Sequence, residues 1–113
     1  MSVTIYHNPR CSKSRQTLAL LEDKNVEINV VEYLSTPPSE AELKRILGLL
    51  SLSAKDIVRK KEAKEAGIDP AALSEAALIK ALVANPMAIE RPIVVSGAKA
   101  VLGRPPENVL DII

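Results

Sequence analysis

Val3-Thr-Ile-Tyr-His-Asn-Pro-Arg-Cys-Ser-Lys-Ser-Arg-Gln-Thr17 is the stretch of sequence that decides the fold. Its β-branched and aromatic start, residues 3–6, predicts a short strand, and the polar turn after it leads into a helix expected over residues 12–24. Cys11 stands where that helix begins, and it is the only cysteine of the chain. Unpaired N–H groups and the helix dipole stabilise an anion at a helix N-terminus, so a thiol in this position loses its proton more readily. Cys11 is therefore a candidate thiolate nucleophile.

The neighbours of Cys11 strengthen this interpretation. The nearby side chains that carry or can acquire positive charge are His7, Arg10, Lys13 and Arg15. Such charge favours a thiolate and attracts an anionic substrate. A lone cysteine is often only a small buried hydrophobe, but such a cysteine normally has apolar neighbours, and those of Cys11 are polar. The segment therefore predicts a reactive sulfur beside an oxyanion-binding site.

The segments after this helix predict a parallel strand pair and then a helical region. Residues 26–33 alternate as a second strand, and a βαβ unit this short implies a right-handed crossover between parallel strands. Thr36-Pro-Pro-Ser39 breaks the pattern, and about four helices follow, because residues that favour helix starts recur before helical runs. The expected starts are Ser39 with Glu42 as a capping box, Ser53 for a helix that reaches Arg59, Asp69-Pro70, and Ser74 for residues 75–84.

The C-terminal part of the chain returns to strands. Residues 92–95 and 99–102 predict a hairpin around a turn over residues 96–98, and residues 107–113 predict a short final helix. The order β-α-β, helices, β-β-α is that of an α/β thioredoxin-like fold with a mixed four-stranded sheet. We expect a single domain over residues 1–113, made of a βαβ part with the nucleophile loop (1–35), a helical insertion (36–88) and a ββα part (89–113).

Composition and charge narrow the function classes. The chain has 113 residues, no Phe or Trp and a net charge of +1, so neither base-stacking platforms nor a broad basic surface indicates a nucleic-acid partner. No signal peptide or apolar stretch of membrane-spanning length is recognisable, and an unpaired cysteine suits a reducing compartment. We therefore expect a cytoplasmic monomer without membrane contact or bound metal. A second thiol for any redox cycle must come from another molecule.

Four spaced motifs carry a resemblance to a known family. They are His7-Asn-Pro-Arg-Cys11-Ser-Lys-Ser-Arg15, Tyr33-Leu-Ser-Thr-Pro-Pro-Ser39, Glu90-Arg-Pro-Ile-Val-Val95 and Gly103-Arg-Pro-Pro-Glu107. In this order, over essentially the whole chain, they resemble the glutaredoxin-coupled arsenate reductase (ArsC) family, whose fold is thioredoxin-like. The resemblance implies cytoplasmic reduction of arsenate to arsenite as part of arsenical resistance. It also implies glutathione as co-substrate, a glutaredoxin as partner and no bound cofactor.

The resemblance further implies which residues form the site. The nucleophilic cysteine of the family falls on Cys11, and its histidine at the end of the first strand falls on His7. Its three oxyanion-binding arginines fall on Arg59, Arg91 and Arg104. This set suits the chemistry, because guanidinium groups bind a tetrahedral oxyanion bidentately and neutralise charge that would repel a thiolate. Attack of the thiolate on arsenic then gives a covalent thiol-arsenate adduct, and an imidazolium at His7 would lower the pKa of the thiol.

Further residues are expected to support this site. Thioredoxin-like folds often carry a cis proline at this place, so the resemblance implies that Pro92 forms a cis peptide bond with Arg91 and holds it close to Cys11. Asn8 should brace the loop. Ser14 stands where a dithiol oxidoreductase would have its second cysteine. Its hydroxyl could donate to the thiolate or cap the helix, and both interpretations stay open.

Two other function classes stay open, and a third is excluded. Cys11-x-x-Ser14 also fits a monothiol oxidoreductase that handles glutathione mixed disulfides, and only the arginines argue for an oxyanion instead. Spx-like transcription regulators resemble the family in fold, but their redox switch is Cys-x-x-Cys, which Ser14 breaks here. Phosphatase-like arsenate reductases are excluded, because they need a Cys-x5-Arg loop and two further cysteines, whereas Thr17 stands at the arginine position.

Overall fold

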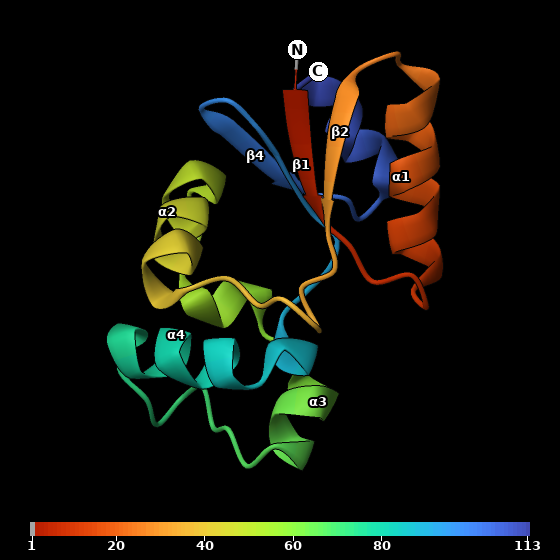
Figure 1. The fold of residues 1–113 in the computed structure, drawn as a ribbon. Helices are drawn as coiled ribbons and strands as arrows, with labels where there is room; N and C mark the ends of the chain where they lie inside the picture. The colour runs from red at the N-terminus through yellow and green to blue at the C-terminus, as the bar shows by residue number, and fades with distance from the viewer. Residues whose placement is uncertain (1) are drawn as a thin grey trace. The chain divides into compact units, whose positions relative to one another are not determined.

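The structure is a computed structural model that describes residues 2–113. The chain divides into two compact units, which we describe one at a time (Figure 1). The sheet unit combines the residues up to Thr36 with Arg91–Ile113, and the helical unit is Pro37–Glu90. In sequence, the helical unit is therefore an insertion between the two halves of the sheet unit.

The sheet unit contains a mixed sheet of four strands in the order β2-β1-β3-β4. The strand β1 (Ser2–Tyr6) pairs in parallel with β2 (Glu27–Val31). On its other side β1 pairs antiparallel with β3 (Ile93–Ser96), which in turn pairs antiparallel with β4 (Lys99–Leu102). This is the predicted thioredoxin-like arrangement of a βαβ half and a ββα half.

Two helices cover one face of this sheet (Figure 1). The helix α1 (Ser12–Asp23) connects the parallel strands and packs against the 3-10 helix η3 (Pro106–Asp111). Val3 and Ile5 point to this face, because side chains two positions apart on a strand lie on the same side of a sheet. The buried side chains that form the core are Val3, Ile5, Leu21, Val94 and Val109.

Gly97 makes the short turn of the β3–β4 hairpin possible. Ser96 pairs with Lys99, so the connection consists only of Gly97 and Ala98. Gly97 has a φ of +59°, a left-handed conformation that such a hairpin turn needs and that glycine adopts without strain. The predicted turn over residues 96–98 was one residue too long, because Ser96 belongs to the strand.

Other boundaries of the sheet unit also differ from the prediction. The helix α1 ends one residue early, with Lys24 as its C-cap, and β2 is shorter than the expected 26–33. The last helix is a 3-10 helix over Pro106–Asp111 instead of an α-helix over 107–113. Short helices and strand ends depend on tertiary contacts that local sequence does not report.

The helical unit contains three α-helices and two 3-10 helices. They are α2 (Glu40–Leu50), η1 (Ala54–Ile57), α3 (Lys60–Glu65), α4 (Glu75–Ala84) and η2 (Pro86–Ala88). The helices α2 and α4 pack together through buried leucine and isoleucine side chains. Ser39 and Ser74 are the N-caps of α2 and α4, as predicted: Ser39 Oγ accepts from the Glu42 N–H at 3.1 Å, and Ser74 Oγ accepts from the Ala77 N–H at 3.2 Å.

Two predictions in the helical unit were wrong. Arg59 is the N-cap of α3 instead of an interior helix residue, because the chain is extended at Val58, which forms a β-bridge with Ile89. Asp69 begins a turn instead of a helix, since its Oδ1 accepts the Ala71 N–H at 3.1 Å and stabilises a local bend. Among residues 2–113, no helix combines the length and apolar character that crossing a bilayer requires.

Candidate active site

Cys11 lies at the N-terminus of α1 in the sheet unit. It is the N-cap residue, with an extended backbone (φ −94°, ψ 124°), and its side chain makes no capping hydrogen bond. Its own N–H donates to the Asn8 carbonyl at 3.0 Å, and its carbonyl accepts from the Arg15 N–H at 3.0 Å. The thiol is partly exposed. The backbone therefore holds the sulfur at the open start of a helix, within reach of solvent.

The surroundings of Cys11 favour the thiolate. Burial alone raises the pKa of the thiol. The opposing contributions are hydrogen bonding from the Ser14 N–H, from the Arg91 guanidinium and from the Lys13 N–H, to which the charge of Arg91 adds. Together these outweigh burial, so the pKa of Cys11 is lower than that of an ordinary cysteine. The direction agrees with the expectation from its position at a helix start.

The loop before α1 is held by its own polar groups. Asn8 is buried, and its Oδ1 accepts the Arg10 N–H at 3.0 Å. Arg15 reaches back along the helix start and donates through Nη1 to the Pro9 carbonyl at 2.9 Å. Asn8 therefore braces the loop, and Arg15 fastens the loop to the first turns of α1.

Ser14 and His7 form a buried pair beneath this loop. Ser14 Oγ accepts the Asn8 N–H at 3.0 Å and lies 2.6 Å from His7 Nδ1, to which its hydroxyl can donate. The backbone N–H of Ser14 hydrogen-bonds the Cys11 sulfur. The contacts of the Ser14 hydroxyl in the structure are with His7 and Asn8.

The environment of His7 disfavours its charged form. Burial lowers the pKa of His7, the carboxylate of Glu32 raises it, and Arg15 lowers it, with a net decrease. The surroundings of the ring therefore disfavour the expected imidazolium beside the thiol. Arg91 supplies the stabilising positive charge in its place.

Two of the predicted arginines belong to the same unit as Cys11. The Arg91–Pro92 peptide bond is cis, as predicted, and Pro92 is fully buried. Arg104 is exposed and donates through Nη1 to the Arg91 carbonyl at 3.2 Å. The bond between Arg104 and Pro105 is also cis, which the sequence analysis did not anticipate. The two segments that carry these arginines are thus joined directly.

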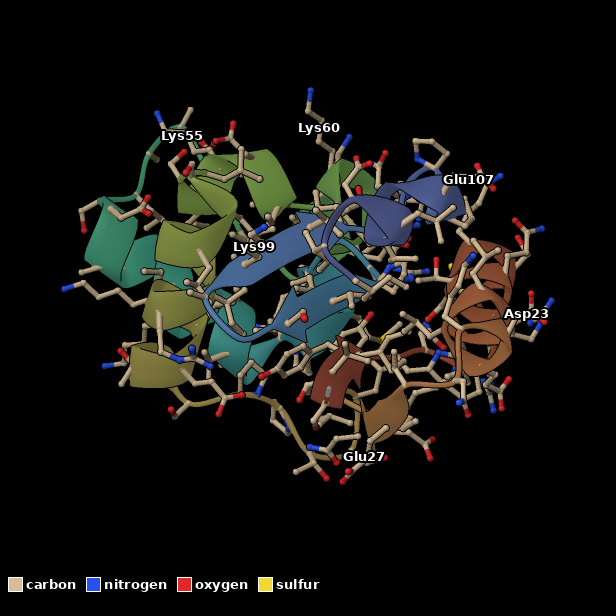
Figure 2. All side chains as sticks on the ribbon, turned by 90° about the horizontal axis from the view of Figure 1, so that it is seen from above. Asp23, Glu27, Lys55, Lys60, Lys99 and Glu107 are labelled. Carbon is tan, nitrogen blue, oxygen red and sulfur yellow. The ribbon has the colours of Figure 1, made fainter. Side chains whose placement is uncertain are left out.

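The third predicted arginine, Arg59, belongs to the helical unit. Its Nη1 lies 3.0 Å from Glu90 Oε1, and its Nε lies 3.4 Å from Glu62 Oε1. The side chain is 22% exposed, so this is not the freely solvated surface charge that its lysine neighbours suggest. Lys60, the next residue, does point outward to solvent (Figure 2).

Two residues of the sheet unit near Cys11 were not predicted as part of the site. They are Thr17 and Gly103, and Gly103 lies against both Thr17 and Pro92. The sequence feature that could have indicated Thr17 is a threonine on the buried face of a leucine-rich helix. Among the described residues, no group of three His, Cys, Asp or Glu side chains is arranged to hold a metal ion.

Comparisons with known proteins identify the family of the chain. The model of the ArsC family matches residues 6–112. An arsenate reductase of Neisseria meningitidis is 47% identical over 110 residues, which cover 95% of this chain and 94% of that protein. An arsenate reductase of Haemophilus influenzae is 47% identical over 116 residues, which cover all of both chains. The solved structure of an arsenate reductase from Vibrio cholerae is 50% identical, with a TM-score of 0.94 over 100% of this chain and 98% of that one. The chain belongs to the ArsC family.

Proposed function

We propose that the protein is an arsenate reductase that converts arsenate to arsenite through a covalent adduct on Cys11. The observation that carries this proposal is the thiol of Cys11 at the start of α1, whose pKa is lowered by two backbone N–H groups and the Arg91 guanidinium despite burial. The relatives named arsenate reductase, at 47% identity over nearly the full chain, support the same substrate.

Arg91 and Arg104 are the proposed ligands of the arsenate oxygens in the sheet unit. A guanidinium that acts on the sulfur can also bind an oxygen of a substrate placed for attack by that sulfur. It thereby reduces the repulsion between a thiolate and an anionic substrate. Arg104 is exposed and fastened to the Arg91 backbone, which suits a second ligand from the neighbouring segment. Arg59 is proposed as a third ligand on the family resemblance.

The first chemical step forms the adduct. The Cys11 thiolate attacks arsenic, a bond between sulfur and arsenic forms, and one arsenate oxygen takes up protons and leaves as water. Arsenic remains in the +5 state, so no electron has yet been transferred. His7 and Ser14 are proposed to act as positioning residues here, because their contact holds the turn whose N–H groups act on the sulfur.

The reducing steps need thiols from other molecules. The chain has one cysteine, so it cannot form an intrachain disulfide. Glutathione displaces a second oxygen as water and binds arsenic through sulfur. A glutaredoxin thiolate then attacks the glutathione sulfur, the glutathione–arsenic bond breaks, and its electron pair reduces arsenic from +5 to +3. Water finally cleaves the bond to Cys11, which releases arsenite and the thiol. The glutathione and glutaredoxin thiols are thereby oxidised to one mixed disulfide.

The test is arsenate-dependent oxidation of NADPH in a mixture of this protein, glutathione, a glutaredoxin and glutathione reductase. We expect a rate that needs every component and disappears in Cys11→Ser. An arsenate-independent rate on a glutathione mixed disulfide, without any arsenate-dependent rate, would contradict the proposal and favour the monothiol oxidoreductase. Absence of both rates, in a protein whose Cys11 is still rapidly alkylated at pH 7, would retain the nucleophile and discard both substrates.

A further inference from the structure

Thr17 is a buried polar side chain that the proposed mechanism does not use. It lies one turn after Lys13 on α1 and is 0% exposed. Its Oγ1 is 2.8 Å from the Lys13 carbonyl oxygen and 3.3 Å from the Gly103 carbonyl oxygen, and the hydroxyl can donate to either. A valine would have the same shape, and a buried hydroxyl is costly unless it is hydrogen-bonded. The hydroxyl therefore joins the first turn of α1 to a segment 86 residues away in sequence.

Gly103 fits against Thr17 because it has no side chain. A Cβ atom at this position would lie 2.6 Å from Thr17 Oγ1 and 2.7 Å from Pro92 Cγ. Both distances are shorter than van der Waals contact permits. The Gly103 N–H also donates to the Pro92 carbonyl at 2.9 Å. Gly103 therefore packs tightly between α1 on one side and Pro92 on the other.

These contacts lead directly to the groups around the sulfur. Lys13, whose carbonyl accepts from Thr17, also supplies one of the N–H groups that act on Cys11. Arg91, whose guanidinium acts on the same sulfur, immediately precedes Pro92. Arg104 follows the glycine and donates to the Arg91 carbonyl at 3.2 Å. The helix start thus meets the Arg104 segment at one buried hydroxyl, and the Arg91 segment is joined to this contact through Gly103 and Arg104.

We infer that Thr17 is a positioning residue, whose hydroxyl fixes the start of α1 relative to the segments that carry Arg91 and Arg104. The inference rests on Cys11 acting as the nucleophile of the proposed function. Without the hydroxyl, its contacts with the Lys13 and Gly103 carbonyl oxygens are both lost, and only packing holds the helix start against the glycine. The separation between the Cys11 sulfur and the Arg91 guanidinium is then less closely defined, which weakens their hydrogen bond.

The test compares Thr17→Val, which removes the hydroxyl at nearly constant volume, with Thr17→Ser, which keeps it. The readout is the pH dependence of Cys11 alkylation by iodoacetamide in the folded protein. We expect the pH of half-maximal alkylation to rise by roughly half a unit or more in Thr17→Val, because a thiolate with weaker support has a higher pKa. In Thr17→Ser the profile should stay within about 0.2 units of the unmodified protein.

A role limited to packing would lower the melting temperature of Thr17→Val and leave its alkylation profile unchanged, and that result would overturn the inference. An equal shift in Thr17→Ser would also overturn it, because the hydroxyl would not be the cause. If Thr17→Val does not fold, Thr17→Ala can be compared with Thr17→Ser. Both side chains are smaller than threonine, and only serine keeps the hydroxyl. Alkylation requires no arsenate, so a shifted profile in a protein that is inactive on arsenate would support the inference while contradicting the proposed substrate.

Discussion

The helices α1 and α4 begin in opposite ways. At α4, Ser74 Oγ accepts the Ala77 N–H at 3.2 Å, and Glu75 places negative charge in the first turn. At α1, the side chain of Cys11 makes no capping hydrogen bond, and the first turn contains no acidic residue. A side-chain cap and an acidic first turn both stabilise a helix start. The start of α1 therefore lacks two stabilising features that α4 has.

The difference makes the start of α1 favourable for a thiolate. In a conventionally capped helix, a serine or aspartate side chain would accept the hydrogen bonds of the first N–H groups. At the start of α1, two such N–H groups donate to the Cys11 sulfur instead. The position that would favour an acidic side chain carries Lys13, whose charge would attract an anionic substrate. The missing side-chain cap and the missing acidic residue thus lower the stability of this helix start, but they favour a thiolate there.

The largest expected effect concerns Arg91. Arg91→Ala removes a guanidinium that hydrogen-bonds the sulfur, so the pKa of Cys11 should rise by about one unit, and kcat/KM for arsenate should fall by about 100-fold. Alkylation profiles measure the first effect and the coupled NADPH assay measures the second. For Arg91→Lys, both the pKa of Cys11 and kcat/KM should lie between those of the unmodified protein and of Arg91→Ala, because lysine keeps the charge but lacks the planar guanidinium group.

The control for Arg91→Ala is Arg45→Ala, which removes an exposed arginine from α2. It should leave both the alkylation profile and the arsenate rate unchanged. If Arg91→Ala behaves in the same way as this control, the start of α1 stabilises the thiolate by itself, and the proposed role of the guanidinium is wrong.

The second prediction concerns stability and pH. The pKa of Cys11 is lower in the folded protein than in the unfolded chain, where it is about 8.5. The thiolate therefore stabilises the fold fully above about pH 8.5, and this contribution is lost as the pH falls through the folded pKa. The free energy of unfolding of the unmodified protein should thus rise with pH relative to that of Cys11→Ser. Denaturant titrations at several pH values measure this free energy. If it depends on pH in the same way in both proteins, the pKa of Cys11 is not lowered by folding.

Local sequence signals predicted the features that depend on neighbouring residues. The strand before Cys11, the helix start at Cys11 and the caps Ser39 and Ser74 all follow from residues a few positions apart. Capping and hydrophobic periodicity act over such distances, so the sequence reports them. The cis bond before Pro92 came from the family resemblance and could not be read from the residues alone.

Long-range contacts account for what the sequence did not predict. Thr17 meets a carbonyl 86 residues away, and no local pattern indicates that partner. The role of the Ser14 side chain depends on the position of His7, which only the folded loop defines. Arg59 becomes an N-cap because Val58 bridges to Ile89 across the helical unit. Residue types could be named from the sequence, but their partners required the structure.

The third prediction concerns the capped helix start of α4. Ser74→Ala removes the cap of α4, so the free energy of unfolding should fall by about 1 kcal/mol. The profile of Cys11 alkylation should not change, because the cap has no part in the thiolate site. Ser74→Asp restores a capping oxygen and should recover most of the loss. Urea unfolding followed by circular dichroism measures the change, and a loss well below 0.5 kcal/mol would show that the hydrogen bond to Ala77 contributes little.

The smallest expected effect lies at the other end of α1. Glu22 and Asp23 place negative charge in its last turn, where the helix dipole favours positive charge, and Asp23 points outward to solvent (Figure 2). Asp23→Lys should therefore raise the free energy of unfolding by about 0.3 kcal/mol, while Asp23→Asn should give about half of that gain. Neither change should shift the alkylation profile of Cys11, because dipole effects fall off within one turn. A shifted profile would mean that charge along the whole of α1 tunes the sulfur, so that the acidic end of the helix, like its uncapped start, belongs to the site.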